Sequence, residues 1–405
     1  MRELLETYHS VEGMNGSKLN NQKIRILQTI GKRRVAVTIP ELSKELKITA
    51  PTCIKLLNQL IADELVLEVG KRDTASGRKP FLYDLNDSAI RVIGVEISMK
   101  RISFAVLDRK LNTLRIKHKT DFVLENNQKS LDQVIGFLQN CINKSGVKHD
   151  DILGMGVGIS GRVSRSVGES FTFMNFMKEP LATHLSEVFK TAVFVDNETR
   201  CFGMAEKISG KAAQFRHSVV INLSRGLGAS LIVNNAMVEG GAGFAGGFGH
   251  MQWGQSDKRC LCGKKGCLAT EVSGNSLEEQ FKEKIAKGKI SIVLQNRPID
   301  QVRYDQILDA AIKGDALSVE LVGQMGFNLG KALGNIINLL NPEAIIIGGK
   351  FSKASQVLLQ PVKMGIESTA LANLMKYCEV DFSEIGEQAG LKGAGAMVLQ
   401  HFEFI

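Results

Sequence analysis

The stretch GHMQWGQSDKRCLCGKKGCLATE, residues 249–271, decides how most of the chain is interpreted. It offers one imidazole and three thiols within eighteen residues: His250, Cys260, Cys262 and Cys267. Gly263 and Gly266 allow the loop to fold back tightly enough for the four side chains to converge. Three thiolates and an imidazole favour zinc over magnesium or calcium, and a set with no open position is typical of structural sites. We therefore predict a structural Zn²⁺ site.

The alternative is that these thiols are incidental or form disulfides. Three cysteines this close resist pairing with one another, and an odd number cannot all pair. The chain has seven cysteines among 405 residues, and the other four are scattered. That usage fits a reducing compartment. The first residues carry acids within their apolar stretch, unlike a signal peptide. No apolar run approaches the roughly 18 residues of a membrane span, so we expect a cytoplasmic protein without membrane insertion.

Positive charge gathers near the start of the chain. The whole chain has a formal net charge of +9, and residues 17–83 hold 13 lysines and arginines against 6 acids. A small segment with such an excess predicts a polyanionic partner.

Three helical patterns follow one another in the same segment. Asn20 or Asn21 is the expected cap of the first, Pro40 marks the start of the second, and Thr49 is the expected cap of the third. Their apolar faces are Ile24, Leu27 and Ile30 in the first, Leu42 and Leu46 in the second, and Cys53, Leu56, Leu57 and Leu60 in the third. These periodicities predict a small three-helix core.

A short turn between the last two helices, with polar residues on the outer face of the third, is typical of a helix-turn-helix. Two strand-like runs, 65–70 and 80–85, follow and are joined by a basic segment. We predict a winged helix-turn-helix domain over residues 17–86 that binds operator DNA. The expected contacts are Thr49, Thr52, Lys55 and Asn58 on the helix and Lys71, Arg72, Arg78 and Lys79 on the wing. The alternative is a protein-interaction module with a solvated hairpin.

Residues 89–405 alternate strand-like and helical stretches, which predicts an α/β domain. Two strand pairs resemble each other, one beginning near Arg91 and the other near His217. Each is a buried strand, a polar turn and a second strand, so we expect two related lobes. Further strands near residues 152–163 and 192–200 run into polar turns, where ligand groups gather.

These residues also carry a family resemblance. The pattern G-H-x9-C-x-C-G-x2-G-C, the turn I-S-G-R-V, the run V-D-N-E and the strand N-P-E-A-I-I-I-G-G resemble the ROK family, named for repressors, open reading frames and sugar kinases. The resemblance covers nearly the whole chain. It implies a two-lobed actin-like (ribonuclease H-like) ATPase fold, a sugar cleft between the lobes, and dimers or tetramers. The N-terminal winged domain places the chain beside the sugar-responsive repressors of the family.

The resemblance also allows the kinase site to be carried over by position. The Asp-x-Gly-x-Thr phosphate loop of ROK kinases stands here as Glu96, Ser98 and Lys100, and the second phosphate loop as Arg225-Gly226-Leu227-Gly228-Ala229. The Asp that serves as catalytic base is Glu198. Because a displacement of about 1 Å can cost about 10²-fold in rate, we predict that the chain is not an enzyme and has no catalytic residues.

The sugar ligands implied by the family are partly present. Asn197 and His250 match, and Glu198 retains a carboxylate. Two family glutamates are replaced, however, by Gly247 and Ala269. Glu271 lies two residues further on and is the candidate replacement. The predicted effector-binding residues are Asn197, Glu198, His250 and Glu271.

Together these features predict a sequence-specific DNA-binding transcriptional regulator, a repressor of carbohydrate-utilisation genes that senses a sugar or sugar phosphate. One alternative is an active ATP-dependent sugar kinase carrying a DNA-binding domain. A third possibility is that residues 89–405 dock a protein regulator. The apolar stripe of residues 321–340 fits lobe core or a subunit interface, and core is the simpler interpretation.

Overall fold

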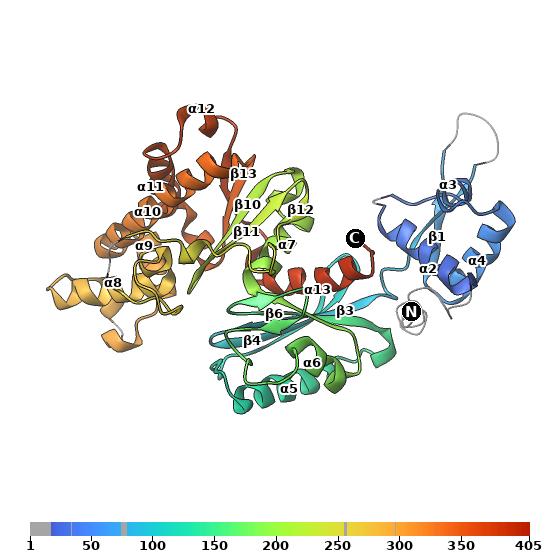
Figure 1. Ribbon diagram of the computed structural model, residues 1–405, viewed down its shortest axis with the longest axis horizontal. Helices are drawn as coiled ribbons and strands as arrows, with labels where there is room; N and C mark the ends of the chain where they lie inside the picture. The colour runs from blue at the N-terminus through green and yellow to red at the C-terminus, as the bar shows by residue number, and fades with distance from the viewer. Residues whose placement is uncertain (1–17, 34, 74–78, 255–256, 296) are drawn as a thin grey trace. The chain divides into compact units, whose positions relative to one another are not determined.

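The computed structural model describes residues 18–33, 35–73, 79–254, 257–295 and 297–405 (Figure 1). The chain forms two compact units, one of Met1–Glu198 with Leu391–Ile405 and the other of Thr199–Gly390. We call these unit 1 and unit 2 and describe each by itself.

Unit 1 begins with a segment of three helices and a hairpin, called here the helical segment (residues 18–86). Its elements are α2 (Lys18–Gly31), α3 (Ile39–Leu46), α4 (Ala50–Ala62), β1 (Val66–Lys71) and β2 (Phe81–Leu85). The two strands pair antiparallel. All nine apolar side chains expected inside are buried. The helices and the hairpin predicted for this region are therefore confirmed.

The local signals at the helix starts explain two of the three boundaries. Pro40 lies in the first turn of α3, and the Thr38 amide donates to Glu41 Oε2 at 2.8 Å, closing a capping box. Thr49 caps α4 by accepting a hydrogen bond from the Thr52 amide. The cap expected at Asn20 or Asn21 was wrong, because α2 begins at Lys18 and contains both. Asparagine costs only a fraction of a kcal/mol inside a helix, so its presence does not force a start there.

The rest of unit 1 is a lobe built on a five-stranded sheet of order β5-β4-β3-β6-β9. Its strands are β3 (Arg91–Ser98), β4 (Arg101–Asp108), β5 (Thr113–Lys119), β6 (Ile152–Ile159) and β9 (Val193–Asn197), with a short hairpin of β7 (Val163–Ser164) and β8 (Glu169–Ser170). Helices α5 (Gln128–Asn143) and α6 (Leu181–Phe189) cover one face, and α13 (Ala389–His401) covers the other (Figure 1).

The two faces of this sheet differ because side chains alternate along a strand. On β6, Met155, Val157 and Ile159 join the core beneath α5 and α6. Gly154 and Gly156 lie on the opposite face. A Cβ atom on Gly156 would meet the carbonyl oxygen of Ala394 at 1.8 Å. The glycines thus allow the backbone of α13 to lie directly on the sheet.

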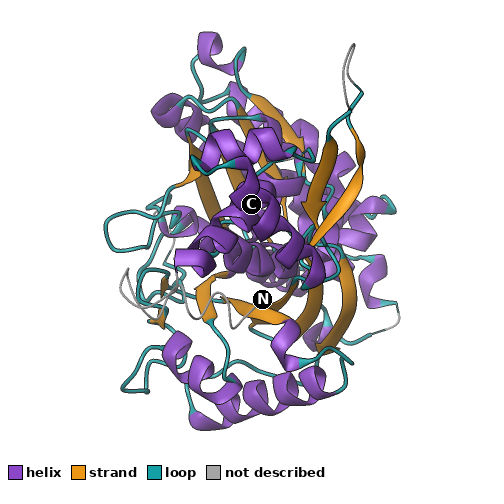
Figure 2. Ribbon diagram, turned by 90° about the vertical axis from the view of Figure 1, so that its right-hand side faces the viewer, coloured by secondary structure: helices purple, strands orange, loops and turns teal. Residues whose placement is uncertain are grey.

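Unit 2 has a second sheet of order β12-β11-β10-β13-β14, which repeats the pairing pattern of the first. In each sheet the first two strands in sequence, β3 and β4 or β10 and β11, pair antiparallel. A later strand, β6 or β13, pairs parallel with the first strand of that pair. Its strands are β10 (Ser218–Leu223), β11 (Leu227–Val233), β12 (Ala236–Met237), β13 (Ala344–Gly348) and β14 (Glu379–Phe382). The prediction of two related α/β lobes is confirmed, and Figure 2 distinguishes their helices and strands by colour.

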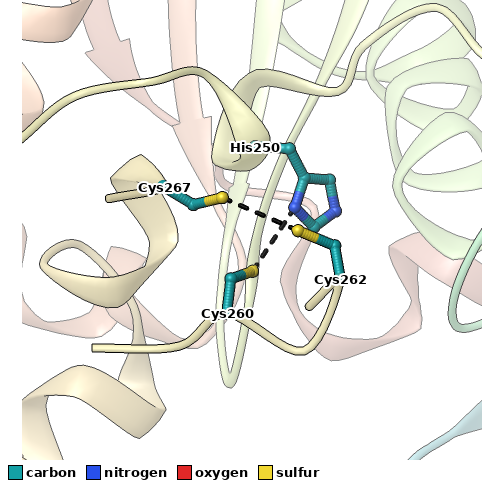
Figure 3. Close-up of side chains that lie close together, drawn as sticks. All are labelled: His250, Cys260, Cys262 and Cys267. Atoms are coloured by element: carbon teal, nitrogen blue, oxygen red, sulfur yellow. Dashed lines mark hydrogen bonds between the residues drawn. The ribbon is translucent and has the colours of Figure 1, made fainter. Parts of the chain in front are cut away.

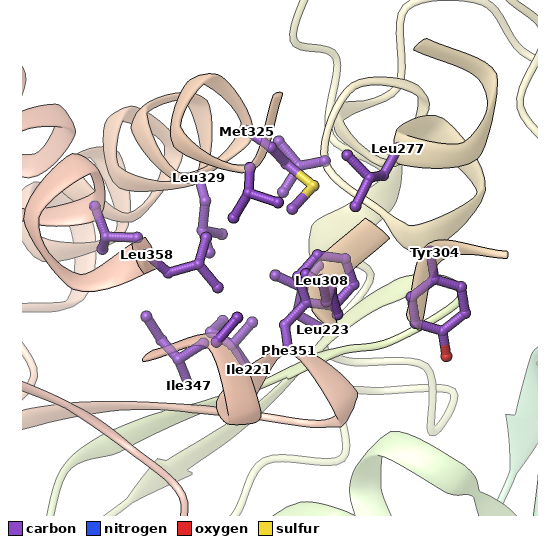
Figure 4. Close-up of a cluster of buried hydrophobic side chains, with 14 of the residues drawn as sticks. Ile221, Leu223, Leu277, Tyr304, Leu308, Met325, Leu329, Ile347, Phe351 and Leu358 are labelled. Carbon is purple, nitrogen blue, oxygen red and sulfur yellow. The ribbon is translucent and has the colours of Figure 1, made fainter. Parts of the chain in front are cut away.

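The helices of unit 2 are α7 (Glu198–Ser209), α8 (Gly274–Ala286), α9 (Tyr304–Ile312), α10 (Ala316–Leu340), α11 (Ser355–Glu367) and α12 (Ala372–Met375). The first residue of α7 belongs to unit 1. Ile221, Leu223 and Ile347 meet side chains of α8 to α11 in one large core (Figure 4). The apolar stripe of α10 contributes Met325 and Leu329 to this core, so the core interpretation of residues 321–340 is confirmed as far as Ile337, while Leu339 and Leu340 are exposed.

Within the described ranges, no helix combines the length and the apolar character needed to cross a bilayer.

Candidate functional site

The four predicted metal ligands converge in unit 2. Their ligand atoms all lie within 4.8 Å of one another, and the side chains point toward a common centre (Figure 3). Cys262 Sγ lies 3.7 Å from Cys267 Sγ, and Cys260 Sγ lies 3.5 Å from His250 Nδ1. A tetrahedral ion with Zn–S bonds of about 2.3 Å separates its sulfur ligands by roughly 3.7 Å. The cluster therefore has the spacing that a tetrahedral metal requires.

The loop that carries the cysteines depends on its glycines, as predicted. Gly263 and Gly266 adopt φ values of 88° and 70°, a region that side chains disfavour. A Cβ on Gly266 would also meet the carbonyl oxygen of Gly254 at 2.3 Å. The Cys260 amide donates to the carbonyl of Lys264 at 2.8 Å, which closes the tight turn between the ligands.

The buried Cys267 thiol resists ionisation unless a positive charge compensates it. Burial, followed by the neighbouring Cys262 and Cys260, raises the pKa of Cys267 to about 12. Three thiols this close cannot all ionise unless a positive charge compensates them, and a bound divalent ion does so. The residues present thus fit a metal, and the Cys3His set favours zinc.

His250 presents one ring nitrogen to this cluster. Nδ1 faces Cys260, while the residue as a whole remains exposed. A metal held at Nδ1 leaves the other nitrogen, Nε2, to meet a different group and fixes the direction in which it points.

Asn197 and Glu198 lie in unit 1, at the end of β9 and the start of α7. Asn197 Nδ2 donates to the carbonyl of Gly161 at 2.6 Å, and the Ser160 hydroxyl donates to Glu198 Oε2 at 2.7 Å. The turn that follows β6 therefore holds two of the four predicted effector residues, Asn197 and Glu198. Desolvation raises the pKa of Glu198 to about 7, against the lowering effect of the Ser160 hydrogen bond.

The fourth predicted effector residue, Glu271, has structural partners within unit 2. Its Oε2 accepts hydrogen bonds from Trp253 Nε1 at 3.1 Å and from Asn328 Nδ2 at 3.4 Å. These bonds hold the segment after Cys267 against the loop and α10. Its effector role stays a prediction, while Ser160 is a neighbour of the site that the sequence did not single out.

The positions of the two kinase phosphate loops carry side chains with structural roles here. Glu96 pairs with Arg101 at 3.4 Å across the β3–β4 hairpin. Arg225 turns toward α8, donating to Asn275 Oδ1 at 2.8 Å and lying 5.5 Å from the Tyr304 ring centre. Arg225 thus places a long side chain where a phosphate loop needs a small residue, and Glu96, at the position of the family's Asp, is engaged by Arg101.

The predicted DNA contacts on α4 lie where the sequence placed them. Thr49, Lys55 and Asn58 are exposed and Thr52 is half-buried, while the opposite side of the helix is buried. The Thr49 and Thr52 hydroxyls lie 2.8 Å apart. The helix thus presents a polar face away from its own core.

One large apolar residue on this face was not among the predicted contacts. Ile54 lies beside Lys55 and is 43% exposed, although it is a large apolar side chain. Apolar side chains on a helix in the major groove contact thymine methyl groups. Its place one residue after buried Cys53 was the signal that could have identified it.

The predicted wing residues differ in their surroundings. Lys71 lies 4.6 Å from the centre of the Phe81 ring, and Lys79 pairs with Asp73 at 2.5 Å. Arg72 donates to Glu41 Oε1 at 2.8 Å, and this hydrogen bond lowers the pKa of Glu41 to about 2. Arg72 therefore holds β1 against α3. Arg78 lies outside the described residues.

The family model described as the ROK family matches residues 92–401. This chain belongs to the ROK family. The resemblance stated from the sequence motifs is therefore confirmed, and the match covers both lobes.

Similar ROK proteins include regulators and kinases. The chain is 24% identical to the xylose repressor of Caldicellulosiruptor bescii, over 93% of this chain and 95% of that protein. Among solved structures, a ROK family transcriptional regulator homologous to the E. coli MLC protein has a TM-score of 0.78 and 23% identity, covering 96% of this chain and 98% of its own. A ROK glucokinase from Streptomyces griseus, solved with glucose and AMPPNP, has a TM-score of 0.68 and 22% identity, covering 76% and 99%. Both structures share the two-lobed fold.

Proposed function

We propose that this ROK protein is a DNA-binding transcriptional regulator, a repressor of carbohydrate-utilisation genes whose ROK lobes sense a sugar or sugar phosphate. The observation that carries the proposal is the exposed polar face of α4 in a chain whose remainder is a ROK domain. The similarity to a xylose repressor extends over 93% of the chain. The glucokinase matches only 76%, so the regulator likeness includes a part that the kinase likeness omits.

The helical segment serves in this proposal as a winged helix-turn-helix domain. The second helix of the motif, α4, lies in the major groove, and the β1–β2 hairpin contacts the backbone. Homo-oligomers, dimers or tetramers, bring two recognition helices to half-sites about one helical turn apart. Light scattering of the purified protein measures the number of chains.

A DNA titration with two kinds of variant tests this assignment. Alanine at Arg78 and Lys79 removes contacts to phosphate, so we expect weaker binding to all sequences. The slope of log affinity against log salt should fall by about 0.9 for each lost contact. Alanine at Ile54 removes a base contact, so the slope should stay constant while operator affinity falls by about 1 kcal/mol or more.

The matched control in this titration is Val69→Ala, an exposed apolar residue of β1 that is absent from the predicted contacts. It should leave both affinity and slope unchanged. An unchanged slope in the Arg78 and Lys79 variant would count against the wing, and an unchanged specificity in Ile54→Ala would count against the base contact.

We further propose that Asn197 and Glu198 are ligands of a sugar effector, and that His250, fixed by zinc through Nδ1, is an effector-binding residue of unit 2. Support comes from the His250–Cys260 geometry and from the bonds that hold Asn197 and Glu198 to the turn after β6. Isothermal titration with pentoses, hexoses and their phosphates should detect a ligand that binds wild type and binds Asn197→Ala far more weakly. Equal binding by that variant would remove the assignment.

Effector binding should also depend on pH near neutrality. The pKa of Glu198 is about 7, and the ionised carboxylate is the stronger acceptor for a sugar hydroxyl. Affinity should therefore rise with pH and be up to about tenfold greater at pH 8 than at pH 6, because a group with a pKa of about 7 is roughly one-eleventh ionised at pH 6 and roughly ten-elevenths ionised at pH 8. Glu198→Gln, of nearly the same shape, should flatten this dependence. If effector affinity still rises with pH in Glu198→Gln, another group is responsible for the pH dependence.

We propose that the protein does not phosphorylate sugars. Two contacts at the phosphate-loop positions support the absence of kinase activity. Glu96 pairs with Arg101, and Arg225 donates a hydrogen bond to Asn275. An assay that couples ADP release to sugar addition should show no turnover above the rate without sugar. Sugar-dependent ADP release would instead establish the alternative, a sugar kinase carrying a DNA-binding domain.

A further inference from the structure

The segment that follows α13 is built into the helical segment. Phe404 is completely buried. A Cβ added to Gly31, the last residue of α2, would lie 3.1 Å from Phe404 Cδ1 and 3.3 Å from Leu85 Cδ1. Phe404 therefore fills the space between the end of α2 and the end of β2, and it comes from the opposite end of the sequence.

The way α13 ends makes this connection rigid. The Glu403 amide donates to the carbonyl of Gln400 at 3.0 Å, and the Phe404 amide donates to that of Leu399 at 2.8 Å. Glu403 is left-handed, with φ 60°. These bonds form a Schellman motif, which terminates a helix in one defined conformation. Phe404 is thus placed by the geometry of α13 itself.

Two polar contacts join the same surfaces. Lys32 Nζ lies 2.7 Å from Glu403 Oε2, and Gln28 Nε2 donates to the carbonyl of Phe402 at 3.4 Å. Both lysine and glutamate are about half exposed, so their ion pair adds little free energy. Together with Phe404, they fix the orientation of α2 relative to the end of α13.

The other part of α13 is fixed on the sheet of the unit 1 lobe. A Cβ on Gly94 would meet the carbonyl oxygen of Leu391 at 2.1 Å, and one on Gly395 would meet the Leu107 side chain at 2.5 Å. The first two residues of α13, Ala389 and Gly390, belong to unit 2, and Leu391 onward belongs to unit 1. Helix α13 therefore starts with residues of unit 2 and lies on the unit 1 sheet, and residues 402–404 that follow it contact the helical segment.

We propose that α13 and its final residues 402–404 are the connection through which the state of the ROK lobes reaches the DNA-binding domain. This inference rests on the proposed function. A movement at the start of α13 is carried as a rigid shift to Phe404, and the shift changes the orientation of α2 and so of the domain that carries α4. Such a connection needs a firm anchor at each end, and the glycine-lined sheet and the Phe404 site supply them.

The test is a double-mutant cycle read by amide hydrogen exchange of α2. Gly94→Ala forces α13 or β3 to shift where Leu391 meets the strand, and Phe404→Ala removes the far anchor. We expect Gly94→Ala to change the exchange of α2 amides by roughly fivefold or more, the lower bound for a typical coupling between sites. In the Phe404→Ala background the same substitution should have no effect on α2.

Gly395→Ala, whose added Cβ would meet only side chains, Leu107 at 2.5 Å and Val92 at 3.2 Å, replaces Gly94→Ala if the stronger clash unfolds the lobe. Ile405→Ala is the matched control, because Ile405 is the next residue along and is 39% exposed. It should leave the effect of Gly94→Ala intact. Equal effects of Gly94→Ala on α2 with and without Phe404 would overturn the inference.

Titration of wild type, Gly94→Ala, Phe404→Ala and the double variant with operator DNA separates this inference from the proposed function. A change of operator affinity in Gly94→Ala that disappears with Phe404→Ala supports both. Coupled exchange in a chain that binds no DNA contradicts the proposed function and leaves the mechanical connection in place. If the chain binds DNA but the effect of Gly94→Ala on α2 amide exchange does not depend on Phe404, the proposed connection is contradicted and the proposed function is not.

Discussion

Loss of the metal is expected to unfold the loop around residues 249–271 and to lower the melting temperature of unit 2 sharply. A structural zinc ion contributes about 10 kcal/mol or more of binding free energy, and in the proposed site that energy would hold Cys260, Cys262 and Cys267 in one tight turn. Cys267→Ser should reproduce the effect of a chelator, because Cys267 is the buried ligand. Elemental analysis should find one zinc per wild-type chain.

Cys378→Ser is the control for this substitution. Cys378 is partly buried and lies outside the cluster, so its replacement should retain the metal and nearly all of the stability. Effector binding should disappear with the metal, since His250 loses the ligand that orients it. Wild-type protein that contains no metal, or a Cys267→Ser variant that melts like wild type, would contradict the structural role.

The second large effect is expected at Gly156 on β6. A Cβ there would lie 1.8 Å from the carbonyl oxygen of Ala394, a backbone atom of α13 that cannot rotate away. Either α13 or the strand must shift, so we expect Gly156→Ala to destabilise the protein by about 3 kcal/mol, the upper end of the usual range for overpacking. Chemical denaturation measures this loss directly.

Gly136→Ala adds the same methyl group but should have the opposite effect on the free energy of unfolding. Gly136 lies in α5, and an added Cβ meets nothing within 4 Å. Alanine should therefore stabilise this helix by up to about 1 kcal/mol. A Gly156→Ala protein as stable as wild type would show that α13 does not lie against the sheet as described.

The features that sequence reasoning located are those encoded over short spans. The metal ligands lie within eighteen residues, and the glycines between them indicate the turn. Thr49 and Pro40 mark helix starts through contacts within one turn. The repetition of strand pairs predicted two lobes because each pair is contiguous along the chain.

The features it did not locate depend on contacts between distant residues. Arg72 meets Glu41, 31 residues away, and Glu271 meets Asn328, 57 residues away. Composition and spacing carry no information on such pairs. The burial of Phe404 against Gly31 is of the same kind.

The glycines of β6 are an intermediate case. Gly154 and Gly156 alternate with Met155 and Val157, and a period of two places both glycines on one face of the strand. That pattern predicts close approach by another backbone. It does not say which segment approaches, because α13 is more than 230 residues further along the chain.

The central claim is that the chain binds a specific DNA sequence and that a sugar changes its affinity for that sequence. Capture of genomic fragments by the purified protein, followed by sequencing, tests it most directly when repeated with mixed sugars and sugar phosphates. The account predicts enrichment of a palindromic site near carbohydrate genes, changed when one sugar is present. Capture of fragments in proportion to their abundance, with no enriched sequence in either condition, would contradict it.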